Sequence, residues 1–191
     1  MSSQSLFSLP VLRRVVVGGL LEFSPILLFL SAFPHFHIYK ATMILMGATI
    51  ISTIVTYRVQ KRLPYLALYV ALLTIIFGYM TLAHREPKFI QMRDTLYDLT
   101  CGFTLVIGLM TNIHFLKLAF HQVIPMTNRA WNKLTYAWIV FFFGAAALNE
   151  YVRRAYDLHA WFDYKSLMVM ITVVFGCLAL YLCYEKEKSH S

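Results

Sequence analysis

Long apolar runs alternate with short polar segments along the whole chain. The runs at residues 63–83 and 166–184 contain no charged side chain. Each is about as long as the roughly 20 helical residues that cross about 30 Å of hydrocarbon. A surface helix of a soluble protein would instead carry polar residues along one face. The pattern therefore predicts an integral membrane protein.

The same pattern predicts an all-α fold, a polytopic membrane helix bundle of five to six transmembrane helices. The expected spans are residues 15–33, 38–57, 63–83, 98–117, 132–152 and 166–184. Their connections are short, so no stretch remains that could fold as a soluble domain. We expect an N-terminal interfacial arm at residues 1–20, a single transmembrane helical domain at residues 21–185 and a cytoplasmic tail at residues 186–191.

The first apolar segment, VVVGGLLEFSPILLFL at residues 15–30, contains one acid and two signals for a break. Ser24 is a good N-cap and Pro25 suits the first position of a helix, while the Gly-Gly pair before them weakens a continuous helix. We expect the first span to start between Glu22 and Pro25, with Glu22 at the helix N-terminus, where its charge is favoured. The alternative is one kinked span with Glu22 inside it, which would make Glu22 a functional candidate.

Composition and charge agree with a membrane protein. The chain is 59% hydrophobic and 14% charged, against about half and about a quarter in soluble domains. Its net charge of +8 is spread in twos and threes between the apolar runs, so no nucleic-acid binding is expected. This distribution is typical of residues that set topology and contact anionic lipid headgroups. With six spans, the excess of Lys and Arg favours both termini in the cytoplasm.

Two groups of charged residues lie near span ends. Arg153 and Arg154 follow Glu150 at i+3 and i+4, which predicts a local ion pair. Asn149, one position deeper, can hydrogen-bond a neighbouring helix. Before the fourth span, residues 84–94 are expected to form a loop with an interfacial piece. Two acids should then cap that span's first turn, Asp94 and Asp98.

Candidate chemistry is sparse. In the six-span topology His35, His37, His84 and His159 all fall on the outer side, where metal binding or pH sensing is conceivable. The His-Phe-His spacing is weak for metal ligands, however, and no carboxylates are ordered around it. The chain also lacks the H-E-x-x-H, G-x-S-x-G, P-loop and G-x-G-x-x-G motifs. We therefore expect no enzyme activity, no cofactor and no metal.

Residues 131–165 resemble the bacterial YciB family, also called intracellular septation protein A. That family carries W-x-x-L-x-x-x-W-x-x-F-F, then a small-residue run ending in Asn, then W-x-x-F-K. The matching residues here are Trp131, Leu134, Trp138, Phe141, Phe142, Asn149, Trp161 and Lys165. Tyr164 stands where the family usually has Phe. Residues 89–99 are similar to the family's F-I-K-x-K segment and LLEFSPILLF to its opening, so the resemblance runs from about residue 20 to 185.

The resemblance implies a multi-pass protein of the bacterial inner membrane that supports envelope integrity, membrane homeostasis and septation. It implies a non-enzymatic scaffold whose partners are anionic lipid headgroups and the membrane proteins of cell division and envelope synthesis, with a homo-oligomer left open. The alternative is a small transporter, channel or lipid-handling protein that uses Glu22, Asn149 and Glu150 inside the membrane. The candidate functional or partner-contact residues are Glu22, Trp131, Trp138, Asn149, Glu150, Trp161 and Lys165.

Overall fold

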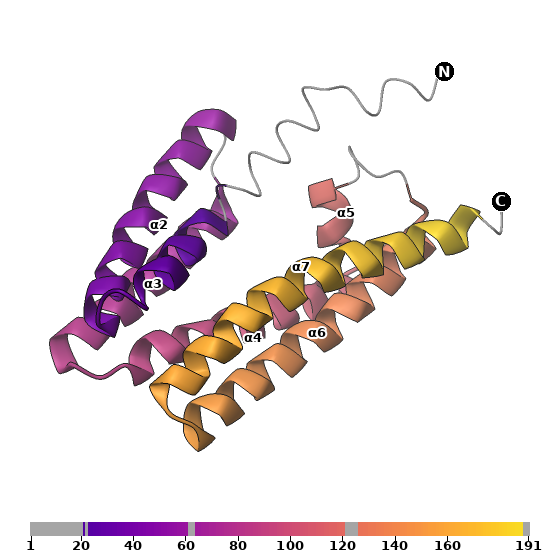
Figure 1. Cartoon of the computed structure of the whole chain (residues 1–191). Helices are drawn as coiled ribbons and strands as arrows, with labels where there is room; N and C mark the ends of the chain where they lie inside the picture. Colours follow the sequence, from indigo (N-terminus) through magenta and orange to yellow (C-terminus); the bar gives the residue numbers. More distant parts are fainter. Residues whose placement is uncertain (1–20, 22, 61–63, 121–125, 189–191) are drawn as a thin grey trace. The chain divides into compact units, whose positions relative to one another are not determined.

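The computed structural model describes residues 21, 23–60, 64–120 and 126–188. These residues form helices and turns and no strand, which confirms the all-α class (Figure 1). The helices are Phe23–Ala32, α2 at Ile38–Gln60, α3 at Tyr65–His84, α4 at Lys88–Met110, α5 at Phe115–Phe120, α6 at Asn128–Ala155 and α7 at Leu158–Lys188.

Three of the described helices are long and apolar enough to cross a membrane. Their spanning stretches are Ile38–Val59, Ala67–His84 and Leu158–Cys183, with a shorter apolar helix at Phe23–Ala32. These helices confirm a helical membrane bundle. α4 and α6 are not among these three helices, so the expected total of five to six spans stays a prediction.

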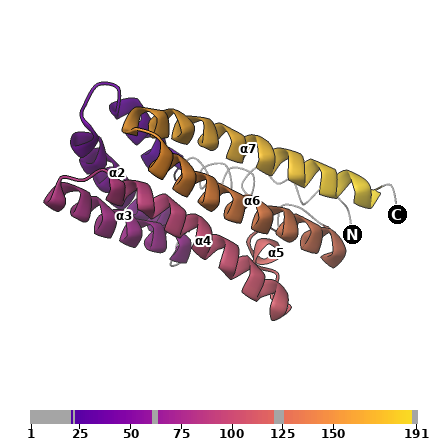
Figure 2. The same cartoon turned by 90° about the horizontal axis from the view of Figure 1, so that it is seen from below.

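The chain divides into two compact units, with the boundary between Tyr97 and Asp98 inside α4. In the unit of residues 9–97, α2 and α3 lie antiparallel and side by side (Figures 1 and 2). A Cβ atom added at Gly78 of α3 would lie 2.6 Å from the Met46 sulfur of α2. Glycine therefore permits this close approach of the two helices. The buried apolar side chains of this unit include Phe29, Ile38, Ala41, Leu45 and Ile90.

The second unit contains the rest of α4 together with α5, α6 and α7. α6 and α7 form a long antiparallel hairpin in both views (Figure 2). Thr127 caps α6 by accepting a hydrogen bond from the Ala130 amide. The Asp157 carboxylate accepts one from the Ala160 amide at 2.9 Å and so caps α7. This cap at the turn between α6 and α7 sets where α7 begins and how it folds back along α6.

The start of the fourth helix differs from the sequence prediction. α4 begins at Lys88 and ends at Met110. The expected loop at residues 84–94 is therefore wrong from Lys88 onward, and the helix begins and ends earlier than the expected span at residues 98–117. Pro87 directly precedes the helix, a position that favours helix initiation. The first turn of α4 contains no acid, so the expected capping by Asp94 and Asp98 is also wrong.

The first apolar segment also departs from expectation at Ser24. Leu21 is helical, and the Ser24 hydroxyl donates a hydrogen bond of 2.9 Å to the Leu21 carbonyl oxygen. A bond to the residue three positions back places Ser24 inside the helix, so the prediction that Ser24 is the N-cap is wrong. Glu22 and the predicted arm at residues 1–20 lie outside the described residues.

Candidate functional site

Two of the candidate residues, Asn149 and Trp161, meet in the interior of the α6–α7 hairpin. The Trp161 indole N–H donates a hydrogen bond of 3.0 Å to the Asn149 side-chain oxygen. Both residues are only 1% exposed. A buried amide and a buried indole each need a polar partner. The prediction that Asn149 bonds a neighbouring helix is therefore confirmed, and the partner is on α7.

A second bond crosses the hairpin one turn away. The Tyr164 hydroxyl donates to the Ala145 carbonyl oxygen at 3.3 Å. Ala145 and Ala146 are both buried, and their small side chains let α7 lie close to the α6 backbone. Lys165 follows on α7 and is half-buried. Of the small residues before Asn149, Ala145 and Ala146 therefore serve helix packing.

Glu150 forms the predicted local ion pairs at the end of α6. Its carboxylate accepts hydrogen bonds from Arg153 and Arg154, with a distance of 3.1 Å from Arg153 Nε to Glu150 Oε2. The Glu150 side chain is 28% exposed and that of Arg154 is 72% exposed. Glu150 therefore forms a salt bridge near the end of α6. Beyond this helix end, hydrogen bonding to Tyr151 raises the pKa of Tyr156.

The other two candidate tryptophans on α6 lie apart from Asn149. Trp138 packs edge-on against Phe141 and Phe175, with ring centroids 5.4 and 5.3 Å away. It also lies against Gly176 of α7, where an added Cβ would be 3.2 Å from the indole ring. Trp131, near the start of α6, is 1% exposed and its indole nitrogen has no hydrogen-bond partner. Both tryptophans are packing residues in this structure.

Sequence reasoning missed a polar row in the unit of residues 9–97. Buried hydroxyl residues recur on one face of α2 and on α3; they are Thr42, Thr49, Ser52, Thr56, Thr74 and Thr81. The spacing of the four on α2, seven, three and four positions, follows one helix face and could have revealed them. Several of these hydroxyls donate a hydrogen bond to a carbonyl oxygen on the preceding turn of their own helix. The Thr74 hydroxyl, for example, donates to the Val70 carbonyl oxygen at 2.7 Å.

Arg93 and Asp94 of α4 add charge to this polar row. The Arg93 guanidinium lies 2.8 Å from the Asp94 carboxylate and donates a hydrogen bond of 3.2 Å to the Thr74 hydroxyl on α3. The two side chains are 12% and 7% exposed. The hydrogen bond from Arg93 to Thr74 joins α4 to α3. Among the described residues, no three His, Cys, Asp or Glu side chains lie together as a metal site would require.

The fold and these sites define a polytopic helical membrane protein. Within its described residues, Asn149 bonds Trp161, Glu150 pairs with two arginines, and Arg93 pairs with Asp94. The sequence profile of the family described as Intracellular septation protein A matches residues 17–190. The chain belongs to this family.

Relatives extend over most of the chain. The inner membrane-spanning protein YciB of Nitrobacter hamburgensis is 34% identical over 161 residues, which cover 83% of this chain and 80% of the relative. The protein of the same name from Vibrio cholerae is 31% identical over 165 residues, covering 86% of this chain and 87% of the relative. No solved structure matches the chain. The relatives and the apolar helices together place the protein in the bacterial inner membrane.

Proposed function

We propose that this inner-membrane protein is a non-enzymatic scaffold that supports envelope integrity, membrane homeostasis and septation. Its partners would be membrane proteins of division and envelope synthesis, together with anionic lipid. The observation that carries the proposal is the bond between Asn149 and Trp161, because it commits the most deeply buried polar side chain of α6 to joining two helices. Glu150 is likewise committed to Arg153 and Arg154.

The outer surface of α7 supports the same proposal. Only 6% of its spanning stretch is buried within the chain. Large apolar side chains project from it, including Leu167, Met170, Val174 and Leu178. A surface of this kind suits lipid chains and the apolar helices of membrane partners, a second copy of this chain included. The excess of Lys and Arg in the inner segments supports a cytoplasmic C-terminus.

Complementation tests the scaffold directly. A strain lacking its own copy would be complemented with wild type, Glu22→Gln, Asn149→Ala, Glu150→Gln or Lys165→Met, and growth, septation and envelope leakage would be scored at matched protein levels. Asn128→Ala, near the start of α6, is the control for Asn149→Ala. A scaffold predicts rescue by Glu22→Gln, Glu150→Gln and Lys165→Met. It also predicts that any defect of Asn149→Ala follows its loss of stability.

A transporter or lipid-handling protein is the second candidate, and one observation favours it. Charged groups buried among apolar helices often mark a pathway, and Arg93 with Asp94 is such a pair, beside Thr74. Asp94→Asn tests it against Asp163→Asn, whose carboxylate is exposed. Loss of rescue by Asp94→Asn alone, at normal protein level and melting temperature, would support a pathway and contradict the scaffold.

A further inference from the structure

Two segments meet at one end of the unit of residues 9–97. The Tyr39 hydroxyl, in the first turn of α2, donates a hydrogen bond of 2.6 Å to the Arg85 carbonyl oxygen after α3. Arg85 adopts the left-handed conformation, with φ 54°, where the chain leaves α3 for α4. The segments 33–41 and 84–89 are therefore tied together, and we call them the basic end.

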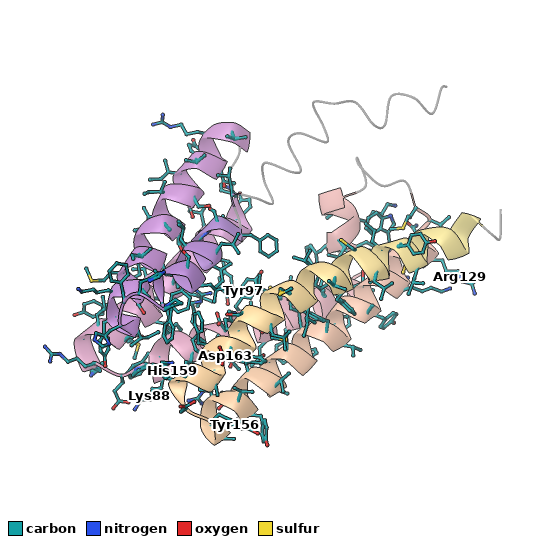
Figure 3. The ribbon with its side chains drawn as sticks, in the orientation of Figure 1. Lys88, Tyr97, Arg129, Tyr156, His159 and Asp163 are labelled. Carbon is teal, nitrogen blue, oxygen red and sulfur yellow. The ribbon has the colours of Figure 1, made fainter. Side chains whose placement is uncertain are left out.

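Positive and titratable groups dominate the basic end. It has one acidic residue, Glu86, against three fixed positive charges and three histidines. All seven side chains are exposed, and they are His35, His37, Lys40, His84, Arg85, Glu86 and Lys88. Glu86 binds Lys88 at 2.6 Å, which leaves Lys40 and Arg85 as the positive charges not offset by it. Figure 3 shows Lys88 at the end of α4 nearest the turn from α3.

Aromatic rings lie beneath two of these cations, Lys40 and Lys88. The Lys40 ammonium is 5.8 Å from the centroid of the Phe36 ring, and the Lys88 ammonium is 5.4 Å from that of Phe89. The His84 ring lies 5.4 Å from the same Phe89 ring. An apolar ring with a cation above it suits the boundary between hydrocarbon and headgroups, because each part meets the environment it prefers.

The ends of the spanning helices set the depth of this surface. One spanning stretch begins at Ile38 and another ends at His84, so we expect the basic end to lie at the depth of the phospholipid phosphates. α2 and α4 both start here, and neither has an acid in its first turn. Their positive helix ends therefore add to the field of the side chains. The anion present in bulk at this depth is the lipid phosphate.

We propose that the basic end binds the phosphate headgroup of an anionic phospholipid and binds it more tightly when its histidines are protonated. The groups that face this phosphate are His35 and His37 before α2, Tyr39 and Lys40 on α2, His84 on α3, Arg85 and Glu86 in the turn and Lys88 on α4. The next charged residues along α4, Arg93 and Asp94, are paired with each other. This inference deepens the lipid contact of the proposed scaffold and does not depend on its protein partners.

Lipid titration of the purified full-length protein in neutral detergent provides the test. The probe is short-chain phosphatidylglycerol, with phosphatidylcholine of equal chain length and glycerol 1-phosphate as comparisons. Binding is measured by native mass spectrometry at pH 5.5 and 8.0. Phosphatidylglycerol should bind at least about tenfold more tightly than phosphatidylcholine. Its affinity should rise several-fold at the lower pH, because protonated histidines add positive charge beside the phosphate.

Two sets of variants assign the effect to the basic end. Replacing Lys40, Arg85 and Lys88 by Gln should weaken phosphatidylglycerol binding about tenfold or more at both pH values. The matched control removes the same number of positive charges elsewhere, with Arg58→Gln, Arg129→Gln and Lys133→Gln, and should bind like wild type.

Replacing His35, His37 and His84 by Gln should abolish the pH dependence and leave binding at pH 8.0 unchanged. The control for this set is His114→Gln with His159→Gln, which should keep the pH dependence. All of the replaced side chains except His114 are exposed, and His114 is half-buried, so folding should survive.

Several results would overturn the proposal. Equal weakening by the two Lys and Arg variant sets would mean that net charge alone attracts the lipid. Competition by glycerol 1-phosphate at the affinity of phosphatidylglycerol would mean a soluble phosphate site.

Wild-type protein with a photoactivatable phosphatidylglycerol gives a test without variants, because labelling should fall in residues 33–41 and 84–89. Normal septation in a strain whose variant has lost lipid binding would leave the scaffold standing and separate the two proposals.

Discussion

The Trp161 indole nitrogen and the Asn149 side-chain oxygen lie 3.0 Å apart, both fully enclosed, and join α7 to α6 across twelve positions of sequence. Neither Asn149→Ala nor Trp161→Phe alone measures this bond, because each also changes packing. A double-mutant cycle isolates it. We expect a coupling energy of about 0.5–2 kcal/mol in the free energy of unfolding, measured by denaturation in mixed micelles. As a control, the stability effects of Trp138→Phe and Asn149→Ala should be additive. A coupling energy near zero between Asn149 and Trp161 would contradict the bond seen in the structure.

Glu150→Gln should have little effect on stability. Its carboxylate is partly exposed and Arg154 is mostly exposed, so water already screens much of the attraction. We expect the free energy of unfolding to fall by less than about 1 kcal/mol, with Arg153→Gln giving a similar value. Unfolding of the two single variants and the double variant checks this. A loss above about 3 kcal/mol would mean that Glu150 is buried in the membrane and essential to the fold.

Gly108→Ala should destabilise the second unit far more than Gly144→Ala. An added Cβ at Gly108 would lie 2.7 Å from the Ile113 carbonyl oxygen and 2.6 Å from the Phe115 ring, whereas at Gly144 it would meet nothing within 4 Å. The carbonyl belongs to the backbone and cannot move cheaply. We expect a loss of about 2 kcal/mol or more at Gly108 and a gain of up to about 1 kcal/mol at Gly144. Thermal melts in detergent compare the two variants. Equal melting temperatures would contradict the close contacts of Gly108 with Ile113 and Phe115 in the turn after α4.

Arg93→Met should be among the most damaging single substitutions in the unit of residues 9–97. It leaves the Asp94 carboxylate buried without its guanidinium and removes the bond to Thr74. The expected loss is about 3–5 kcal/mol. Adding Asp94→Leu should recover part of it, because an apolar pair carries no desolvation cost. The exposed Lys88→Met serves as control and should lose less than about 0.5 kcal/mol. No recovery in the double variant would mean that Asp94 has a role beyond this pair.

Local spacing predicted the contacts that stay within one helix or one turn. The Glu150 pairs follow from i+3 and i+4 neighbours on α6, and an Asn inside a long apolar run predicted a bond to another helix. The identity of that partner did not follow, because it depends on the register of α7 on α6. That register is fixed at the turn where Asp157 caps α7.

The start of α4 was predicted wrongly because Pro87 and the alternation of charged with apolar residues after it were taken as signs of a loop. Arg93 is stabilised inside the helix by Thr74 of α3, a contact between residues 19 positions apart that no local pattern contains. Pro87, immediately before Lys88, was the available signal for a helix start. The buried threonines carry no charge, and their spacing along one helix face was the only sign of them in the sequence.

The most direct test of the scaffold replaces the central polar pair by apolar residues. A strain lacking its own copy would carry Asn149→Leu together with Trp161→Phe, with septation and envelope leakage scored at a protein level equal to wild type. Removing both partners of a buried bond costs much less than removing one, so a structural role predicts that the double variant rescues better than Asn149→Leu alone. Failure of a folded, normally abundant double variant to rescue would mean that Asn149 or Trp161 acts on a substrate, and the scaffold account would be wrong.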